Sequence, residues 1–332
     1  MNSVPIRFER IFLEKVWGGR NLATTPGFEL PEEMLVGETW EVVDREDENS
    51  VSATGASSGR ALRQLMEQEE RAILGDSTAN SKGRFPLLVK YIDACQALSI
   101  QVHPDDESAK RVGGSAEGKT EAWYILAAEP NAAIYSGLKP GVTREQFEAS
   151  AKDEALEELL VRWDVQAGDC ITLLGGTIHA IGAGVTLLEV QQNSDTTYRV
   201  WDWGRLGLDG KPRETHFAEA LEVISFGGRP RPPVRAVREA IGECLSRARQ
   251  SQTDFFALDS VEVRGAAEFS TNNRFEIIVI TEGDGVLEFS GQTQKQQVSI
   301  GETWLLPAAM GDYRLASMGE SISFVSLTDG YR

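Results

Sequence analysis

The sequence predicts a mainly β protein built from jelly rolls or related barrels, with few helices. Short segments rich in Ile, Leu, Val and Phe recur between turn residues, and 32 of the 332 residues are glycine. The segment GDCITLLGGTIH at 168–179 is echoed by GETWLLPAAMGD at 301–312. Both consist of a glycine and an acid, an apolar strand and a turn, so we expect two related β domains.

The expected elements follow in order along the chain. Strands are expected at 6–13, 86–93 and 98–103, at 121–128 and 131–138 as a pair around the turn Glu129-Pro130-Asn131, and at 169–174, 185–190 and 196–203. Helices are expected at 59–74, where apolar residues have helical spacing, from Thr143 to about Trp163, and at 216–224. Gln146 lies three residues after Thr143, as in a capping box.

A basic, proline-containing segment is predicted to separate the domains. Residues 228–250, GRPRPPVRAVREAIGECLSRARQ, combine early prolines with many arginines, which favours a linker. We expect a first domain with helical insertions at 1–230, a linker at 231–254 and a second β domain at 255–332. The second domain contains no histidine, because the last of three is His216. An imidazole-bound metal is therefore expected only in the first domain.

Composition excludes several classes of partner. The net charge of −18 and the sequence pI of about 4.7 argue against nucleic acid and anionic membranes, although a local basic pocket could still bind a small phosphorylated substrate. Cys95, Cys170 and Cys244 are odd in number and widely spaced, which favours a reducing cytoplasm over a disulfide framework. No secretory signal is recognisable, and no apolar run approaches the roughly 20 residues of a membrane helix. We expect a cytoplasmic monomer or weak homodimer.

Four polar side chains form a candidate metal-binding set. Gln101 and His103, in LSIQVHPDDESAK, project to the same face of a strand because side chains alternate. Glu121 opens the apolar strand of GKTEAWYILAA, and His179 lies in the small-residue turn GTIHAIGAG. Taken singly, each has an ordinary structural interpretation. Gln101 and His103 would be a pair on the surface, Glu121 a charge at the start of a strand, and His179 a packed histidine. Together they offer two nitrogens and two oxygens, which suits zinc or a similar divalent ion.

Longer segments resemble a known family. The segments FPLLVKYIDACQALSIQVHPDDESAK, GKTEAWYIL and GTIHAIGAGVTLLEVQQNSDTTYRVWDWGR closely resemble the type I mannose-6-phosphate isomerases in their short bacterial form. ERIFLEKVWGGRNL, VGETWEV and KPRETHFAEAL are similar too, so the resemblance covers most of residues 6–226. It implies a zinc-dependent enzyme with two cupin-type jelly-roll (double-stranded β-helix) domains. Such an enzyme interconverts mannose 6-phosphate and fructose 6-phosphate.

The resemblance also implies roles for individual residues. It assigns one zinc ion per chain, in the first domain, to the ligands Gln101, His103, Glu121 and His179. It places the family's active-site arginine at Arg199 and its lysines at Lys90 and Lys119. We expect Arg199 and Lys119 to act in catalysis and the lysines to contact the phosphate or a sugar oxygen, with Lys90 as the substrate-binding one. Ser99 shares the strand face of Gln101 and His103, so we expect it to add a phosphate contact. The family usually has a proline and a small polar residue before GTIHA, where this chain has Leu174 and Gly175. We therefore expect a looser turn before His179.

The expected reaction is metal-assisted proton transfer between C1 and C2 of the open-chain sugar, through an enediol. Arg199 would stabilise the developing oxyanion. Lys119, Asp195, Glu121 and a metal-bound water remain alternatives for the group that moves the proton, and His216 is expected to begin a helix outside the site. The ligand set alone leaves two other functions open. One is a non-catalytic cupin that binds metal and sugar phosphate; the other is an iron cupin dioxygenase, in which the lysines and Arg199 would have no evident role.

Overall fold

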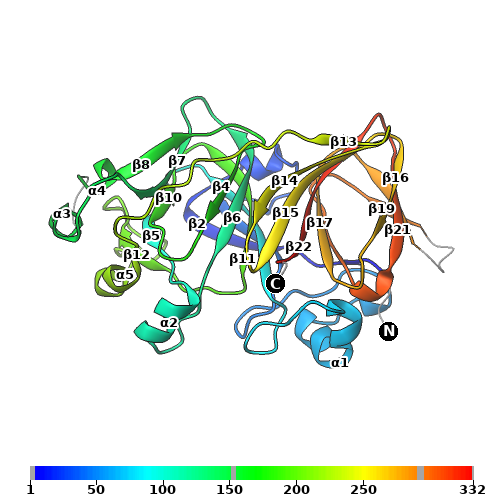
Figure 1. The fold of residues 1–332 in the computed structure, drawn as a ribbon, viewed down its shortest axis with the longest axis horizontal. Coiled ribbons are helices and arrows are strands. Elements are labelled where there is room, and N and C mark those ends of the chain that lie inside the picture. The colour runs from blue at the N-terminus through cyan, green and yellow to red at the C-terminus, as the bar shows by residue number, and fades with distance from the viewer. Residues whose placement is uncertain (1–3, 151–154, 290–294, 331–332) are drawn as a thin grey trace.

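The computed structural model describes residues 4–150, 155–289 and 295–330. Four antiparallel sheets are arranged as two β units that lie side by side (Figure 1). One six-stranded and one five-stranded sheet are formed by residues 11–201, and one seven-stranded and one four-stranded sheet by residues 239–329 together with a short strand near the N-terminus. The predicted mainly β, two-jelly-roll class is confirmed.

The first unit holds the candidate site. The order of its six-stranded sheet is β2-β3-β4-β11-β6-β9, with bounds Ile11–Gly19, Val36–Val42, Leu87–Ala94, Val185–Gln192, Glu121–Ala128 and Cys170–Leu173. The order of its five-stranded sheet is β12-β5-β10-β7-β8, with bounds Tyr198–Trp201, Ile100–Val102, His179–Ile181, Ala133–Leu138 and Leu160–Asp164.

The second unit has the same plan. The order of its seven-stranded sheet is β1-β20-β17-β22-β15-β14-β13, with bounds Ile6–Arg7, Thr303–Leu306, Glu276–Glu282, Ile322–Asp329, Phe256–Val263, Leu245–Gln252 and Glu239–Ile241. The order of its four-stranded sheet is β16-β21-β18-β19, with bounds Ala266–Ser270, Asp312–Ser317, Gly285–Phe289 and Gln296–Val298.

The sequence echo coincides with this repetition of strand order. The chain passes from β9 in one sheet to β10 in the other, and likewise from β20 to β21. Glu121, the first residue of β6, pairs with Leu173 at the end of β9, and Glu276, the first residue of β17, pairs with Leu306 at the end of β20. Glu276 therefore occupies in the second unit the backbone position that Glu121 has in the first.

The two large sheets pack back to back. One buried cluster contains Tyr91, Val190 and Leu188 from the six-stranded sheet together with Leu305 and Leu327 from the seven-stranded sheet. Strands that are covered on both faces are therefore mainly apolar on both. The opposite face of the six-stranded sheet lines the interior of the first barrel. A charged residue on that face is an exception, because it is buried and needs a partner.

The helices differ in part from the expectation. Their bounds are Leu62–Leu74 (α1), Asp106–Val112 (α2), Arg144–Ser150 (α3), Ala155–Glu158 (α4) and Phe217–Val223 (α5), with 3-10 turns at Asn21–Ala23, Gly55–Ser57 and Ala308–Met310. The helices expected at 59–74 and 216–224 are confirmed over most of their length. The helix expected to reach Trp163 is wrong beyond α4, since β8 pairs there with β7, and residues 151–154 lie outside the described residues. No described helix is long and apolar enough to span a membrane.

Two further expectations need correction. The strands at 121–128 and 131–138 form as β6 and β7, but they belong to different sheets and do not pair with each other. The turn between them, with Asn131 at φ 67°, sends the chain from one sheet to the other. The expected linker at 231–254 contains β13 and β14, which extend the seven-stranded sheet. We keep the division near residue 230 as a proposal and assign 239–252 to the second unit.

Candidate metal centre

The predicted ligands converge inside the first barrel. β5 and β10 are neighbours with Gln101 opposite His179, and His103 follows directly after β5. Glu121 begins β6 in the facing sheet. Ligand atoms of His103, Glu121 and His179 all lie within 4.8 Å of one another, and each of these residues is at most 2 % exposed.

Backbone carbonyls orient both imidazoles. The Nδ1 atom of His103 lies 2.8 Å from the carbonyl oxygen of Thr196, and the Nδ1 atom of His179 lies 2.8 Å from that of Thr177. A carbonyl oxygen only accepts, so Nδ1 carries the proton in each ring and Nε2 presents its lone pair. Nε2 of His103 lies 3.0 Å from Lys119 Nζ, and Nε2 of His179 lies 3.4 Å from the amide nitrogen of Gln101. Metal-bound histidines commonly have this outer hydrogen bond. Burial, followed by the charge of Lys119, lowers the pKa of His103 to about 4, and burial also lowers the pKa of His179.

Glu121 presents a carboxylate to these two lone pairs. Its oxygens lie 3.4 Å from Nε2 of His103 and 3.4 Å from Nε2 of His179. Neither oxygen accepts a hydrogen bond from the described residues, although Lys119 Nζ lies 2.8 Å from Oε2. Burial alone would raise the pKa of Glu121, but the charge of Lys119 and the two histidines hold it well below its usual value. A buried, ionised carboxylate facing two imidazole lone pairs fits a divalent cation.

Gln101 reaches the same place from the strand beside His179. Its Nε2 atom lies 3.4 Å from Nε2 of His179, while its Oε1 atom accepts a hydrogen bond from Ser99 Oγ at 3.2 Å. An amide binds a metal ion through oxygen. Gln101 would therefore need to turn its amide group over in order to act as a ligand.

A chain of buried charges flanks the ligands, and the sequence reasoning missed half of it. Lys90 Nζ lies 3.0 Å from Glu189 and 3.7 Å from Glu38, and Lys119 Nζ lies 3.7 Å from Glu189. Trp123 Nε1 donates to Glu189 at 2.9 Å. Two sequence patterns could have revealed these carboxylates. Glu189 is a single acidic residue inside the apolar run VTLLEV, and Glu38 is an acidic residue within VGETWEV.

These partners fix the charge states of Lys90 and Glu38. Burial opposes the charged form of Lys90, but the carboxylates of Glu189 and Glu38 raise its pKa overall. Burial would raise the pKa of Glu38, but Lys90 and then Lys15 lower it to about 2. Lys90 is thus an ammonium at neutral pH whose charge is already matched by protein carboxylates.

Arg199 lies beside the ligand strand. Arg199 is opposite Gln101 in the pairing of β12 with β5, and its Nε donates to Ser99 Oγ at 3.3 Å. Burial, and then the charge of Arg213, lower the pKa of Arg199. Arg205 and Arg213 both bind Asp202, at 2.8 Å and 2.6 Å. The guanidinium groups of Arg205 and Arg213 therefore lie close enough to act on Arg199, and Arg199 is the one of the three that contacts Ser99.

The other two candidates lie outside the cluster. His216 stands at the N-terminal end of α5, as expected, and its Nδ1 atom accepts from the backbone N–H of Arg199 at 3.4 Å. Asp195 is exposed on the loop after β11, and with His216 it lines a cavity of about 510 Å³.

The turn before His179 is not loose. The N–H of Gly176 donates to the carbonyl oxygen of His103 at 2.7 Å, and Thr177 N–H donates to Leu174 at 3.0 Å. A Cβ atom at Gly175 would lie 2.5 Å from the backbone nitrogen of Asp105. The expectation was wrong because Gly175 permits direct backbone packing that holds His103 and His179 together.

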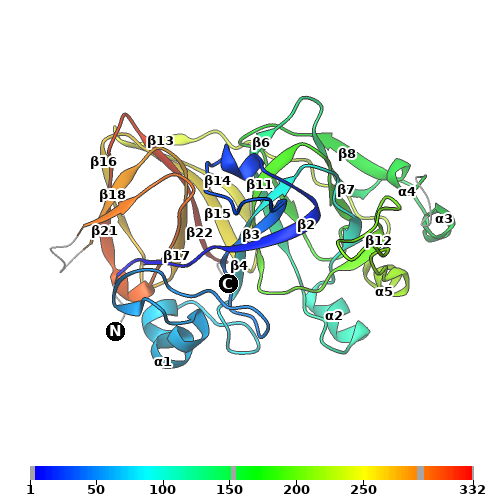
Figure 2. The ribbon, with the colours of Figure 1, turned by 180° about the vertical axis from the view of Figure 1, so that it is seen from behind.

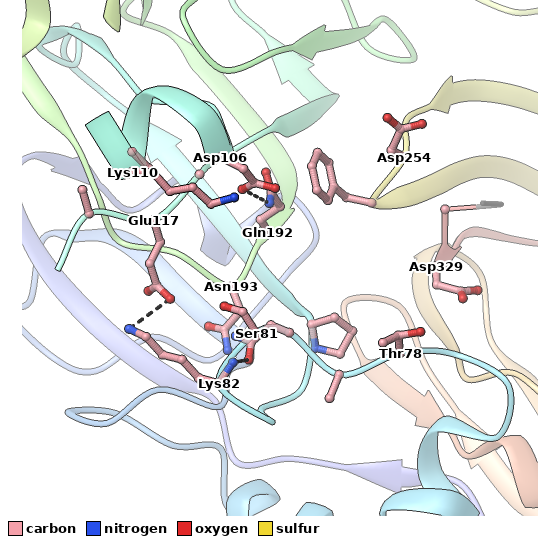
Figure 3. Close-up of a pocket in the computed structure, with 18 of the residues that line it drawn as sticks. Thr78, Ser81, Lys82, Asp106, Lys110, Glu117, Gln192, Asn193, Asp254 and Asp329 are labelled. Atoms are coloured by element: carbon pink, nitrogen blue, oxygen red, sulfur yellow. Dashed lines mark hydrogen bonds and ion pairs between the residues drawn. The ribbon is translucent and has the colours of Figure 1, made fainter. Parts of the chain in front are cut away.

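A larger cavity of about 780 Å³ lies between the α2 loop and the second unit (Figure 3). Its walls include the ion pair of Lys82 with Glu117 and the hydrogen bond from Gln192 to Asp106. None of the eight predicted site residues lines it. The larger cavity is thus not the one that contains the buried histidines and the carboxylate of the candidate metal site.

Comparisons with known proteins agree with this geometry. Residues 6–143 match the model of the phosphomannose isomerase type I catalytic domain, and residues 249–326 match that of the mannose-6-phosphate isomerase cupin domain. The mannose-6-phosphate isomerase ManA of Bacillus subtilis is 35 % identical over 97 % of this chain and 99 % of its own. That of Streptococcus mutans is 32 % identical over 85 % and 86 %. The crystal structure of the Bacillus subtilis mannose 6-phosphate isomerase matches with a TM-score of 0.87 and 32 % identity, covering 97 % of this chain and 99 % of that one.

Replacement of either clustered histidine should remove the metal. We expect His103→Ala and His179→Ala to bind zinc at least about a hundredfold more weakly, because each removes a ligand rather than an outer hydrogen bond. His216→Ala, the third histidine, is the matched control and should keep the metal. The measurement is elemental analysis after gel filtration, and a histidine variant with wild-type metal content would exclude that residue as a ligand.

Proposed function

The chain belongs to the type I phosphomannose isomerases, which interconvert mannose 6-phosphate and fructose 6-phosphate, and we propose that it uses a zinc ion bound by His103, His179, Glu121 and Gln101. The observation that carries this proposal is the unsatisfied, ionised carboxylate of Glu121 between two Nε2 lone pairs. Family membership does not favour the two alternatives, a non-catalytic cupin that binds metal and sugar phosphate and an iron cupin dioxygenase. A bound zinc ion would supply Lewis-acid polarisation of the sugar carbonyl and hydroxyl oxygens.

The chain's own residues would orient the sugar and handle its charge. Arg199 stays positively charged at neutral pH and can stabilise an oxyanion that develops at C1 or C2. Lys119 touches both His103 and Glu121, at 3.0 Å and 2.8 Å, and we assign to it the holding or transfer of the proton. Asp195 is exposed, so we favour Lys119 over it. Lys90, held charged by Glu189, would donate to a sugar oxygen.

The phosphate group needs a cationic partner that is not already neutralised. Lys90 and Lys119 each lie beside carboxylates, whereas Arg205 and Arg213 share the carboxylate of Asp202, and Arg199 donates to the Ser99 hydroxyl and the backbone carbonyl of Glu214. Guanidinium groups bind phosphate oxygens in pairs of hydrogen bonds. We propose that this arginine cluster, with the hydroxyl of Ser99, holds the phosphate, and that Lys90 contacts the sugar.

We also propose where the protein is located and how it assembles. Cys95, Cys170 and Cys244 are free thiols, which is compatible with the reducing cytoplasm that we propose. We propose a monomer or weak homodimer in solution, which sedimentation would measure.

Metal removal tests the proposed cofactor. Dialysis against a strong chelator should abolish the conversion of mannose 6-phosphate to fructose 6-phosphate, because the Glu121 carboxylate and imidazoles alone polarise no oxygen. One equivalent of zinc should restore it, with magnesium as the control, since nitrogen ligands disfavour that ion. Undiminished turnover by protein shown to be free of metal would end this proposal.

The Arg199→Ala variant tests whether this residue contributes to kcat without contributing to metal binding. We expect unchanged metal content and a kcat lower by about a hundredfold or more, as when one preorganised charge-stabilising donor is removed. Arg199→Lys, which keeps the charge without the fork of donors, should recover part of that loss. An alanine variant with the wild-type kcat would remove Arg199 from the mechanism.

Arg213→Ala tests the phosphate site. A hydrogen bond to a charged group contributes about 1.5–3 kcal/mol, so the KM for mannose 6-phosphate should rise roughly tenfold to a hundredfold. Arg162→Ala, which removes an exposed arginine paired with Asp164 on β8, is the control and should leave KM unchanged. If Arg213→Ala had the wild-type KM at each ionic strength tested, this residue would have no part in binding phosphate.

A further inference from the structure

The strands that carry Glu38 and Lys90 face the second unit on their other side. In the pairing of β3 with β4, Trp40 lies opposite Lys90, and Thr39 lies opposite Tyr91. Side chains alternate along a strand, so Tyr91 points away from the site when Lys90 points into it. Tyr91 belongs to the buried cluster shared by the two large sheets.

Arg10 connects the face of the six-stranded sheet that carries Tyr91 to the second unit. The residue lies between β1 and β2 in the sequence. Figure 2 shows the chain, coloured blue, running from the N-terminus beside the second unit to β2 in the first. Its Nε and Nη2 atoms donate to the two carboxylate oxygens of Glu41, at 2.7 Å and 3.2 Å, and Nη2 also donates to the carbonyl oxygen of Gly301, at 2.7 Å. Its guanidinium lies 3.4 Å from the ring centre of Phe28. Charge, hydrogen bonds and stacking thus fix one side chain.

Glu41 occupies an irregular point of β3. The register with β4 shifts between Trp40 and Val42, so Glu41 has no opposite residue there. Such bulges re-aim the side chains around them and are frequent beside active sites. Glu41 is 5 % exposed and also accepts a hydrogen bond from Thr39 Oγ1 at 2.8 Å. The residue before it, Trp40, donates from Nε1 to Glu38 at 2.9 Å.

Gly301 supplies the contact from the second unit. Its φ is +81°, and a Cβ atom there would lie 2.6 Å from the ring of Phe28. Its carbonyl oxygen also accepts a hydrogen bond from the hydroxyl of Tyr91 at 3.4 Å. One carbonyl group therefore holds both Arg10 and Tyr91, whose strand neighbour is Lys90.

We propose that Arg10 is a positioning residue for the isomerase site. Through the Gly301 carbonyl it ties the bulge at Glu41 to the second unit, and the fixed bulge aims Glu38 and Lys90 at the substrate. The second unit, which has no histidine, thereby acts on the reaction from behind the six-stranded sheet. This inference rests on the substrate contact proposed for Lys90.

The test compares two arginines that both bind the second unit. Arg7, on β1, pairs with Glu302 at 2.9 Å and lies over the ring of Trp304, so Arg7→Ala weakens the anchoring of β1 within the second unit without removing the contact of Arg10 to Glu41. Arg10→Ala should lower kcat/KM by about tenfold to a hundredfold, as expected for a misplaced substrate contact, with metal content unchanged. Arg7→Ala should keep the wild-type value at temperatures well below the unfolding midpoint.

A double-mutant cycle with Lys90→Met separates positioning from general destabilisation. The readout is the apparent Kd of the zinc-loaded protein for the equilibrium mixture of the two sugar phosphates, which also serves for inactive variants. If Arg10 acts through Lys90, Arg10→Ala should weaken binding in the wild-type background and have little further effect once Lys90 is methionine. If Arg10→Ala does not fold, Arg10→Lys takes its place, since lysine can still pair with Glu41 but cannot also reach Gly301 as a fork.

Three outcomes would count against the inference. They are wild-type kinetics for Arg10→Ala, an equal loss for Arg7→Ala, and the same loss of binding in both Lys90 backgrounds. Failure of the underlying proposal would look different, because Lys90→Met itself would then show wild-type binding and turnover. The Lys90→Met single variant therefore distinguishes an error about Arg10 from an error about the site.

Discussion

The site depends on one buried negative charge. Glu121 is 1 % exposed and begins a strand that is otherwise apolar. A carboxylate removed from water is strongly destabilising unless cations or hydrogen-bond donors face it. Lys119 supplies one positive charge, but the described residues donate no hydrogen bond to either oxygen. The two Nε2 lone pairs are acceptors as well, and a divalent cation between them and the carboxylate would bind all three groups.

The packing of the large sheets explains why this charge can be placed so firmly. β4, β6 and β11 are covered by the second unit on one face and line the barrel on the other. Their barrel-facing charges, Lys90, Glu189 and Glu121, therefore lie in a row across three adjacent strands, and Lys119 adds the second positive charge that pairs with Glu121. The same burial that makes each charge costly alone gives the row a fixed geometry, which is what a catalytic site requires.

The sequence predicted the ligand strands well and the long-range partners poorly. Gln101, His103, Glu121 and His179 could be singled out because strand alternation and turn position are local properties. Glu38, Glu189 and Arg10 depend on which strands become neighbours, and no local pattern contains that information. The same limit caused the errors at β6 and β7, which are adjacent in sequence but separated into two sheets, and at β8, where pairing with β7 overrides the helical pattern.

The repeat shows how far a fold alone determines chemistry. Glu276 has the backbone position of Glu121 and is also buried, yet Tyr313 donates to it at 2.8 Å and Ser326 donates to its other oxygen. Burial raises the pKa of Glu276, whereas the cation Lys119 and the two histidines lower that of Glu121. The jelly roll therefore supplies the place for a carboxyl group, and the neighbouring side chains decide its charge. At Glu276 two hydroxyl groups donate to the carboxyl oxygens, whereas Glu121 faces Lys119 and two imidazoles, and only the latter surroundings offer nitrogen ligands to a metal.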